Sequence, residues 1–151
     1  MSNKKDPPRR TDYVTYVPIS TRWADNDVYG HVNNVVYYSF FDTAVNQHLI
    51  EHKVLEIETS PVIGLVVETT CRYFSSITYP DRVEVGIKVR QIGSSSVTYD
   101  LAVFCNDDEI ASAAGHFVHV YVDRATNRPI TIPPATRRVL EQLIDNRPAH
   151  S

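Results

Sequence analysis

The chain has 151 residues, of which 42% are hydrophobic and 22% are charged, as expected for one ordinary globular domain. Its formal net charge of -3 argues against nucleic acid as a partner, because nucleic acid requires a basic face. No uninterrupted apolar stretch is long enough to cross a bilayer, so we expect no membrane span.

The two ends of the chain are predicted to be tails around a single domain. Residues 1–12 are polar and contain prolines, which predicts disorder. They carry charge with no apolar run behind it, which argues against a signal peptide and predicts a cytoplasmic location. The domain is expected to span residues 13–146, with a second tail at 147–151.

The first predicted elements are a strand and a long helix. The strand covers residues 13–23. The segment from Asn34 to Glu51 is predicted to be a helix rather than a strand because of its length and its Asn33-Asn34 capping signal. This helix is apolar around most of its circumference, so other structure should wrap it.

Turn signals separate the strand-like runs that follow the helix. These runs are Val62–Phe74, Val83–Ile92, Ser95–Cys105 and Glu109–Val122. Pro133-Pro134 then opens a short helix, whose apolar stripe consists of Val139, Leu140, Leu143 and Ile144. The predicted fold class is α+β, an antiparallel five-stranded sheet wrapped around one long central helix.

The strand-like runs contain cysteines and small residues with structural interpretations. Cys71 and Cys105 show no metal-ligand spacing, and we expect them to be reduced core thiols. The small residues of the last run would let a helix lie close against the sheet. They are Ala111, Ala113, Ala114 and Gly115.

The histidines outside the loop before the long helix predict no metal site. His116 and His119 are three residues apart in a predicted strand, so alternation sends them to opposite faces. His48 and His52 have the i, i+4 spacing of a helical pair, but no third ligand is evident.

The stretch from Thr21 to Asn34 carries the chemistry of the chain. It places two acids, a glycine, a histidine and two amides ahead of the helix. A carboxylate beside a helix N-terminus can attack a carbonyl, or activate water against it, while the carbonyl oxygen lies on the helix amides. A calcium loop is excluded because its fifth and twelfth positions would be Tyr29 and Val36.

The motif resembles that of the hotdog-fold acyl-CoA thioesterases of the 4-hydroxybenzoyl-CoA thioesterase type. It consists of Asp25, Asp27, Gly30, His31, Val32, Asn33 and Asn34, followed by Tyr37 or Tyr38, Phe41 and Asp42. The resemblance runs from about Val17 to about Pro134. It implies the hotdog fold, hydrolysis of an acyl-CoA thioester, no cofactor apart from the CoA of the substrate, and a homodimer or a tetramer built as a dimer of dimers.

The resemblance also implies roles for the motif residues. Asp27 would be the catalytic carboxylate, acting either as nucleophile or as general base. The backbone N–H of Asn34 would polarise the thioester carbonyl, and first-turn amides are suited to this because they lack helical acceptors. His31 is either a general base or a hydrogen-bonded loop residue, and Asp25 is predicted to be structural.

A second acid lies inside the predicted helix. Asp42 is interpreted as a buried structural residue paired with Arg22 or Arg72. It is also the second candidate for the base, because another branch of hotdog thioesterases carries its catalytic acid on this helix.

Substrate contacts are expected outside the acidic pair as well. Gly30 and Asn33 form the approach to the helix, and the segment from Gly64 to Glu68 would be the opposing wall of an acyl pocket between protomers. Arg90 and Ser95 are candidates for contacts to the nucleotide of CoA. Residues 93–96 lack the basic side chains of some relatives, which favours an acyl carrier protein as an alternative donor, and they also fit a plain hairpin turn.

Two other functions are compatible with this fold. A hotdog dehydratase acting on hydroxyacyl thioesters would need a His-Phe-Pro-Gly stretch, which the sequence lacks. A non-catalytic acyl-thioester binding protein would not need the intact Asp27 or the motif from Gly30 to Asn34.

Overall fold

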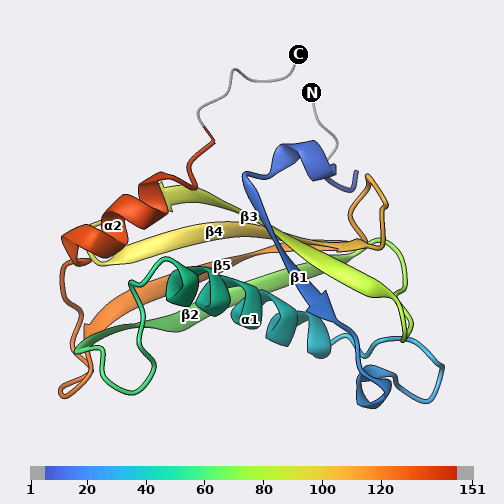
Figure 1. Ribbon diagram of the computed structural model, residues 1–151, viewed down its shortest axis with the longest axis horizontal. Helices are drawn as coiled ribbons and strands as arrows, with labels where there is room; N and C mark the ends of the chain where they lie inside the picture. The colour runs from blue at the N-terminus through green and yellow to red at the C-terminus, as the bar shows by residue number, and fades with distance from the viewer. Residues whose placement is uncertain (1–5, 146–151) are drawn as a thin grey trace.

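Figure 1 shows the computed structural model of the chain, of which residues 6–145 are described. Its elements, with η marking a short 3-10 helix, are η1 (Arg10–Asp12), β1 (Thr15–Ser20), η2 (Trp23–Asp25), α1 (Val36–Glu51), β2 (Val62–Tyr73), β3 (Arg82–Ile92), β4 (Ser96–Cys105), β5 (Ala113–Asp123) and α2 (Pro134–Glu141). The predicted order of strand, long helix, four strands and short helix is confirmed.

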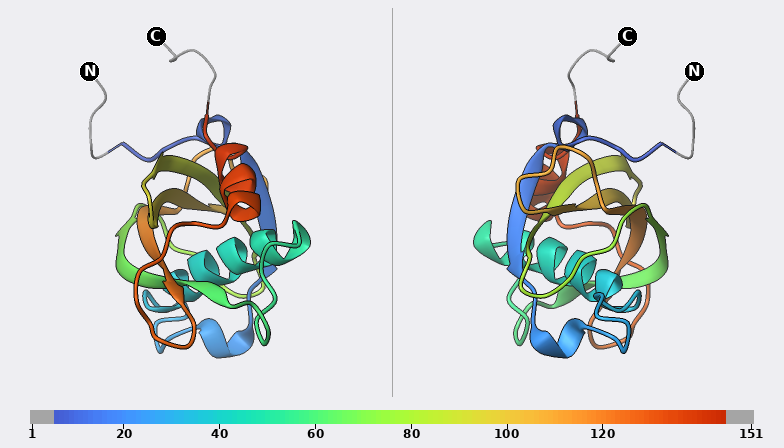
Figure 2. Two further views of the ribbon diagram at one scale, coloured as in Figure 1. Left: turned by 90° about the vertical axis from the view of Figure 1, so that its left-hand side faces the viewer. Right: turned by 90° about the vertical axis from the view of Figure 1, so that its right-hand side faces the viewer.

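The strands form one five-stranded sheet in the order β1-β3-β4-β5-β2, with every neighbouring pair antiparallel. The side views show the sheet curving around α1, which lies across its concave face (Figure 2). Of the apolar stripe predicted for the last helix, Val139 and Leu140 lie on α2 and are buried in the same core. Leu143 is buried there too and Ile144 partly buried, but both follow the end of α2 at Glu141. The predicted α+β hotdog architecture is therefore confirmed.

The long helix buries only one of its sides. The residues on that side are Tyr37, Phe40, Phe41, Ala44, Val45, His48 and Leu49. Asp42 lies on the other side and is exposed, so the prediction that it is a buried acid is wrong. Arg22, one of its predicted partners, pairs with Asp25 instead. The error arose because the sheet covers one side of α1, although the helix is apolar around most of its circumference.

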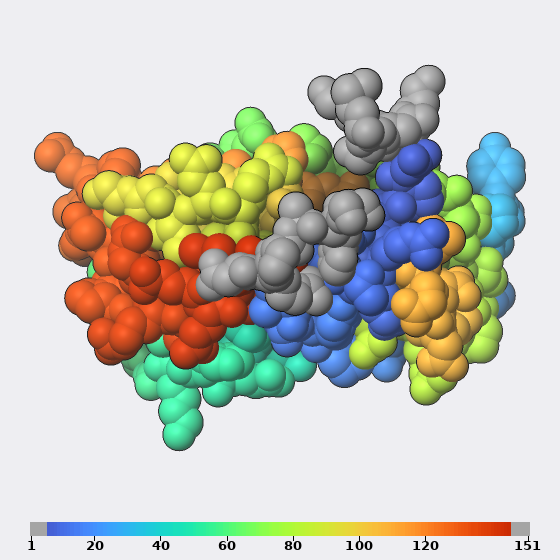
Figure 3. Space-filling view, turned by 90° about the horizontal axis from the view of Figure 1, so that it is seen from above, coloured from blue at the N-terminus to red at the C-terminus, as the bar shows by residue number. Residues whose placement is uncertain are grey.

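The N-terminal segment differs from the tail predicted at 1–12. Residues 10–12 form η1, and the Arg10 guanidinium lies 2.6 Å from the Glu84 carboxylate and donates to the carbonyl of Asp108 at 2.8 Å. Seen from above, this segment and the connection between β4 and β5 lie side by side (Figure 3). Residues 1–5 and the tail predicted at 147–151 lie outside the described residues.

The small residues predicted to let a helix lie close against the sheet divide into two groups. Ala113 is buried in the same core as the residues of α1, whereas Ala111, Ala114 and Gly115 make room for other parts of the chain. Ala111 and Ala114 pack with Tyr13 and Phe104 on the convex side of the sheet. Gly115 lies against the backbone of β2, where an added Cβ would sit 1.8 Å from the carbonyl oxygen of Thr70. Gly115 therefore allows a close approach between strands, and Ala111 and Ala114 allow one by the N-terminal segment.

A buried polar cluster lies between the sheet and α1. It consists of Tyr99, His119 and Tyr121, which are 1%, 2% and 4% exposed. Within the described part of the chain, neither ring nitrogen of His119 and neither tyrosine hydroxyl has a hydrogen-bond partner of good geometry. His116, by contrast, lies on the convex face, so the prediction that the two histidines face opposite ways is confirmed.

Burial of His119 predicts acid-sensitive stability. Desolvation lowers its pKa from 6.5 to about 4, so the unfolded chain binds a proton more readily than the folded chain. The free energy of unfolding should therefore fall as the pH drops through the range from 6.5 to about 4, by about 3 kcal/mol in total. Urea unfolding at a series of pH values measures this loss.

The variant His119→Phe should flatten that profile between these two pH values, because it removes the titrating ring. His116→Gln is the matched control, since it removes a histidine that is paired with Glu68 on the convex face. An unchanged profile in His119→Phe would assign the acid sensitivity to other groups.

Candidate active site

The acidic loop before α1 is anchored by Asp25. This side chain is 2% exposed and accepts hydrogen bonds from the Arg22 guanidinium at 2.8 and 3.1 Å and from the Arg22 backbone N–H at 2.8 Å. Its backbone carbonyl accepts the N–H of Asn33 at 2.8 Å. Asp25 therefore ties the two ends of the loop together, in agreement with the structural role predicted for it.

Asp27 forms the turn that follows. One carboxylate oxygen, Oδ1, accepts the backbone N–H groups of Tyr29 at 2.9 Å and His31 at 3.3 Å. Gly30 closes the turn by donating its N–H to the Asp27 carbonyl at 3.1 Å, with a positive φ of 78° that favours glycine. Within the described residues, no donor contacts the other carboxylate oxygen of Asp27. The backbone amides thus hold the carboxylate in place while one oxygen stays available.

The turn that leads into α1 leaves one backbone amide free. The side chain of Asn33 accepts the N–H of Val35 at 3.1 Å, and its carbonyl accepts the N–H of Val36 at 2.9 Å. No group in residues 6–145 accepts the N–H of Asn34. The Asn34 carbonyl is held from the sheet, because the Tyr73 hydroxyl of β2 donates to it at 2.9 Å.

A cavity of about 300 Å³ brings these groups together. Its lining includes Asp27, His31 and Asn34, three residues that the sequence motif predicted for the site. The other lining residues are Val32, Tyr37, Tyr73, Phe74, Ser75 and Ser76. Among the described residues, Asp27 is the only carboxylate in this lining. The arrangement places a carboxylate and a free helix-start amide around one small volume.

Tyr73 and Tyr37 were not predicted as site residues. Their rings meet edge to face with centroids 5.0 Å apart. Burial raises the pKa of Tyr37 to about 12, and burial together with nearby Cys71 raises that of Tyr73 further, so both hydroxyls stay protonated at neutral pH. The signal available in the sequence was alternation, which places Cys71 and Tyr73 on the same face of a strand.

The remaining predicted contacts lie elsewhere in the protomer. Gly64 is paired with Tyr121, and the carbonyl of Ser95 accepts the Tyr121 N–H at 2.7 Å, so both lie at the end of the sheet opposite Tyr73. Arg90 lies on the convex side of the sheet, where its guanidinium is 2.5 Å from Asp100. A single protomer therefore does not bring these three residues to Asp27.

Other candidate chemistry is absent or distant. Within residues 6–145 no group of three or more His, Cys, Asp or Glu side chains could hold a metal ion, and no helix is long and apolar enough to cross a membrane. Cys71 and Cys105 are both free, and burial raises their pKa values to about 11 and about 12, so neither supplies a thiolate.

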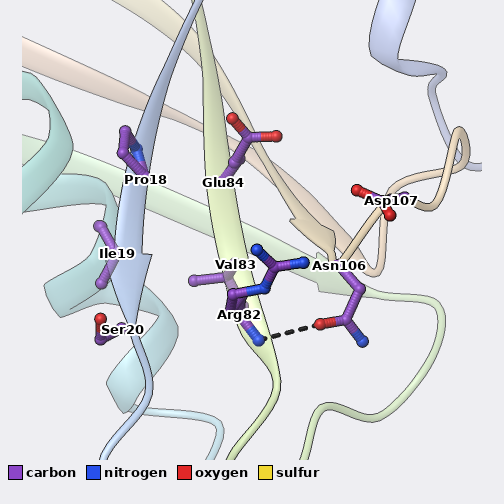
Figure 4. A pocket seen from close by; sticks show the side chains of 8 residues that line it. All are labelled: Pro18, Ile19, Ser20, Arg82, Val83, Glu84, Asn106 and Asp107. Atoms are coloured by element: carbon purple, nitrogen blue, oxygen red, sulfur yellow. Dashed lines mark hydrogen bonds between the residues drawn. The ribbon is translucent and has the colours of Figure 1, made fainter.

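A second cleft lies between the end of β1, the start of β3 and the β4–β5 turn (Figure 4). There the backbone N–H of Arg82 donates to the side chain of Asn106 at 3.0 Å. The charged side chains in its lining, Arg82, Glu84 and Asp107, are of both signs, and none belongs to the acidic motif. We assign no chemistry to this cleft.

Comparison with known proteins gives one family match. Residues 21–140 match the thioesterase-like superfamily. The PA5185 protein from Pseudomonas aeruginosa strain PAO1 is 51% identical in sequence, with a TM-score of 0.91 over 93% of this chain and 98% of that chain. Slr0204, a 1,4-dihydroxy-2-naphthoyl-CoA thioesterase from Synechocystis, shares the fold at 15% identity, with a TM-score of 0.76 over 85% of this chain and 96% of that chain.

The sequence is also similar to a curated protein of Bacillus subtilis (strain 168), the uncharacterized protein YsmA. The two are 22% identical over 89 residues, which are 59% of this chain. The match covers 60% of the length of that relative.

Proposed function

Because the chain belongs to the thioesterase-like superfamily, we propose that it hydrolyses acyl-CoA thioesters to a free acid and CoA. The observation that carries the proposal is the joint placement of Asp27 and Asn34. A carboxylate with one oxygen held by two amides, and a backbone N–H with no acceptor, line the same cavity. Thioester hydrolysis needs both parts, a nucleophile or base and a donor for the developing oxyanion.

In this mechanism the thioester carbonyl oxygen accepts the N–H of Asn34 at the start of α1. The aligned peptide dipoles of the helix favour negative charge there. The free oxygen of Asp27 either attacks the carbonyl carbon, giving an acyl-enzyme anhydride that water then cleaves, or removes a proton from the attacking water. The thiolate of CoA is a good leaving group, so one carboxylate is sufficient without a strong general acid.

We further propose that the working form is a dimer joined along β2. This strand lies at an edge of the sheet, and its apolar residues Leu65, Val66 and Val67 are 40%, 43% and 60% exposed. An exposed apolar edge strand is a template for pairing with a second copy. Such pairing would place the segment from Gly64 to Glu68 as a wall of the partner's acyl pocket.

A substrate panel tests the proposed activity directly. Aliphatic and aromatic acyl-CoAs, and the same acyl groups on an acyl carrier protein, are incubated with the protein, and released thiol is measured. Turnover of at least one acyl-CoA is the expected result, and turnover on the carrier protein alone would change the donor. Hydration or dehydration of the acyl chain without thiol release would identify a dehydratase instead. Saturable binding without turnover would identify a binding protein.

The hydroxyl of Tyr73 should affect thiol release because it holds Asn34 in place at the start of α1. Tyr73→Phe removes the donor to the Asn34 carbonyl and keeps the ring. We expect kcat for thiol release to fall about fivefold, the effect of losing about 1 kcal/mol of hydrogen bonding. Tyr79→Phe is the matched control, because Tyr79 contacts Trp23 outside the cavity. Equal kcat values in the two variants would mean that the bond from Tyr73 does not position the site.

A further inference from the structure

Part of the wall of the Asp27 cavity has no role in the mechanism described above. It comes from the connection that follows β2, where Ser75 and Ser76 both line the cavity. Both residues are exposed, and within residues 6–145 neither hydroxyl makes a hydrogen bond. Two hydroxyls that can donate and accept therefore lie beside the same small volume as the carboxylate of Asp27.

The other two hydroxyls of this cavity are less open to a ligand. The Tyr73 hydroxyl already donates to the carbonyl of Asn34 at 2.9 Å. Tyr37 is only 2% exposed, and its ring packs edge to face on that of Tyr73. The hydroxyls available to a small polar molecule in the cavity are therefore those of the serine pair.

The backbone on both sides of the serine pair is fixed. The N–H groups of Phe74 and Ser75 both donate to the carbonyl of Ser112, at 2.8 and 3.2 Å, and Ser112 is 1% exposed. After the pair, the carbonyl of Ile77 accepts the N–H of Val32 in the acidic loop at 2.7 Å. These bonds tie the serine segment to the sheet and to the loop that carries Asp27, so its position relative to the carboxylate is set by the fold.

The cavity can hold a water molecule beside a thioester. Its volume is about 300 Å³, whereas one water molecule occupies about 30 Å³ in the liquid. An ordered water needs two to four polar partners. The free oxygen of Asp27 can accept one proton of such a water, and a serine hydroxyl can accept the other. A water held in this way keeps a lone pair free to attack.

We propose that Ser75 and Ser76 hold the hydrolytic water, so that Asp27 acts as a general base and not as the nucleophile. This inference rests on the proposed function and chooses between its two routes. A wall of free hydroxyls is what a water-mediated route requires. Attack by the carboxylate itself would instead require the carbonyl carbon to contact Asp27 with no water between them.

In the proposed step the water oxygen forms a bond to the thioester carbonyl carbon, while one water proton passes to the free oxygen of Asp27. The carbonyl oxygen becomes an oxyanion on the N–H of Asn34. The C–S bond then breaks as the carbonyl re-forms, and the leaving thiolate takes the proton back from Asp27. The products are the acid and the thiol, and the Asp27 carboxylate is restored.

Single-turnover kinetics on the full-length chain test this inference, with enzyme in excess over the best acyl-CoA of the panel. Thiol and free acid are measured in the same quenched samples. In Ser75→Ala and Ser76→Ala both products should form about fivefold more slowly, and in the double variant about 30-fold more slowly. Because water is the attacking group, thiol and acid should appear together. The steady-state KM should change by less than about twofold.

Hydroxylamine gives a readout that a purely structural role would not change. It is a stronger nucleophile than water and depends less on being held, so the ratio of acyl hydroxamate to acid should rise in the alanine variants. Ser75→Thr and Ser76→Thr keep a hydroxyl and should stay within about threefold of wild type. Ser39→Ala is the matched control, because the Ser39 hydroxyl donates to the Val36 carbonyl of its own helix at 2.7 Å. It should change neither the rate nor the ratio.

The outcomes separate this inference from the proposed function. A burst of thiol followed by slow release of acid in the double variant would overturn the inference, because an acyl-enzyme would then form first, with Asp27 as the nucleophile. Wild-type rates and ratios in the alanine variants would also overturn it and would leave the proposed hydrolysis standing. Absence of thiol release by the wild type on the whole substrate panel would refute the hydrolysis, and the inference with it.

Discussion

Replacing Asp27 by asparagine is expected to lower kcat for thiol release by about 1,000-fold. The amide oxygen of asparagine can still accept the N–H groups of Tyr29 and His31, so the turn should keep its shape. The amide carries no negative charge, so it can neither attack the thioester nor take a proton from water. The variant should therefore lose the catalytic chemistry while keeping the fold. Steady-state thiol release with the best acyl-CoA of the panel measures the loss of kcat.

Variants of two other aspartates test whether the loss of kcat is specific to Asp27. Asp107→Asn, in the turn after β4, controls for loss of a surface carboxylate and should stay within about twofold of wild type. Asp42→Asn tests the second candidate base, which lies on the exposed side of α1. A large loss in Asp42→Asn with near-normal turnover in Asp27→Asn would transfer the catalytic role to the helix. Circular dichroism of each variant confirms that the fold is kept.

The sequence predicts well those features that depend on residues close together along the chain. The long apolar run after Asn34 and the alternating runs between turn signals are each decided by neighbouring residues. The acidic loop belongs to the same class. Asp25 and Asp27 bond to amides no more than four positions away, apart from the tie between the Asp25 carbonyl and Asn33. Hydrogen bonds between residues this close in sequence can be inferred from the sequence alone.

The features that escaped prediction depend on residues distant in sequence. Tyr73 reaches the site because its hydroxyl meets the carbonyl of Asn34, 39 positions earlier. Residues 10–12 form η1 instead of part of a disordered tail, and Arg10 contacts Glu84 and Asp108, which lie 74 and 98 positions later. Asp42 was misplaced for a related reason, since an apolar helix does not reveal which side the sheet leaves open. Pairing across the sheet, rather than propensity, decides these cases.

Gly115→Ala is expected to destabilise the sheet severely. A Cβ at this position would lie 1.8 Å from the carbonyl oxygen of Thr70, 2.7 Å from its carbonyl carbon and 3.0 Å from the Cα of Cys71. All three are backbone atoms of β2, so no change of side-chain rotamer relieves the clash. The strands must separate where Cys71 pairs with Gly115. We expect the free energy of unfolding to fall by at least about 3 kcal/mol, measured by urea denaturation.

Gly64→Ala is the matched control on the same pair of strands. Its Cβ would meet the Nδ1 atom of His119 at 3.1 Å, and a side chain can shift by a few tenths of an ångström, so the expected loss is no more than about 1 kcal/mol. The strand that Gly115 holds in place also carries Tyr73, which contacts the helix start. Gly115→Ala should therefore reduce thiol release even in the fraction that remains folded. If Gly115→Ala were as stable as the wild type, β2 would have to lie farther from β5 than a separation of 1.8 Å between the added Cβ and the Thr70 carbonyl oxygen implies.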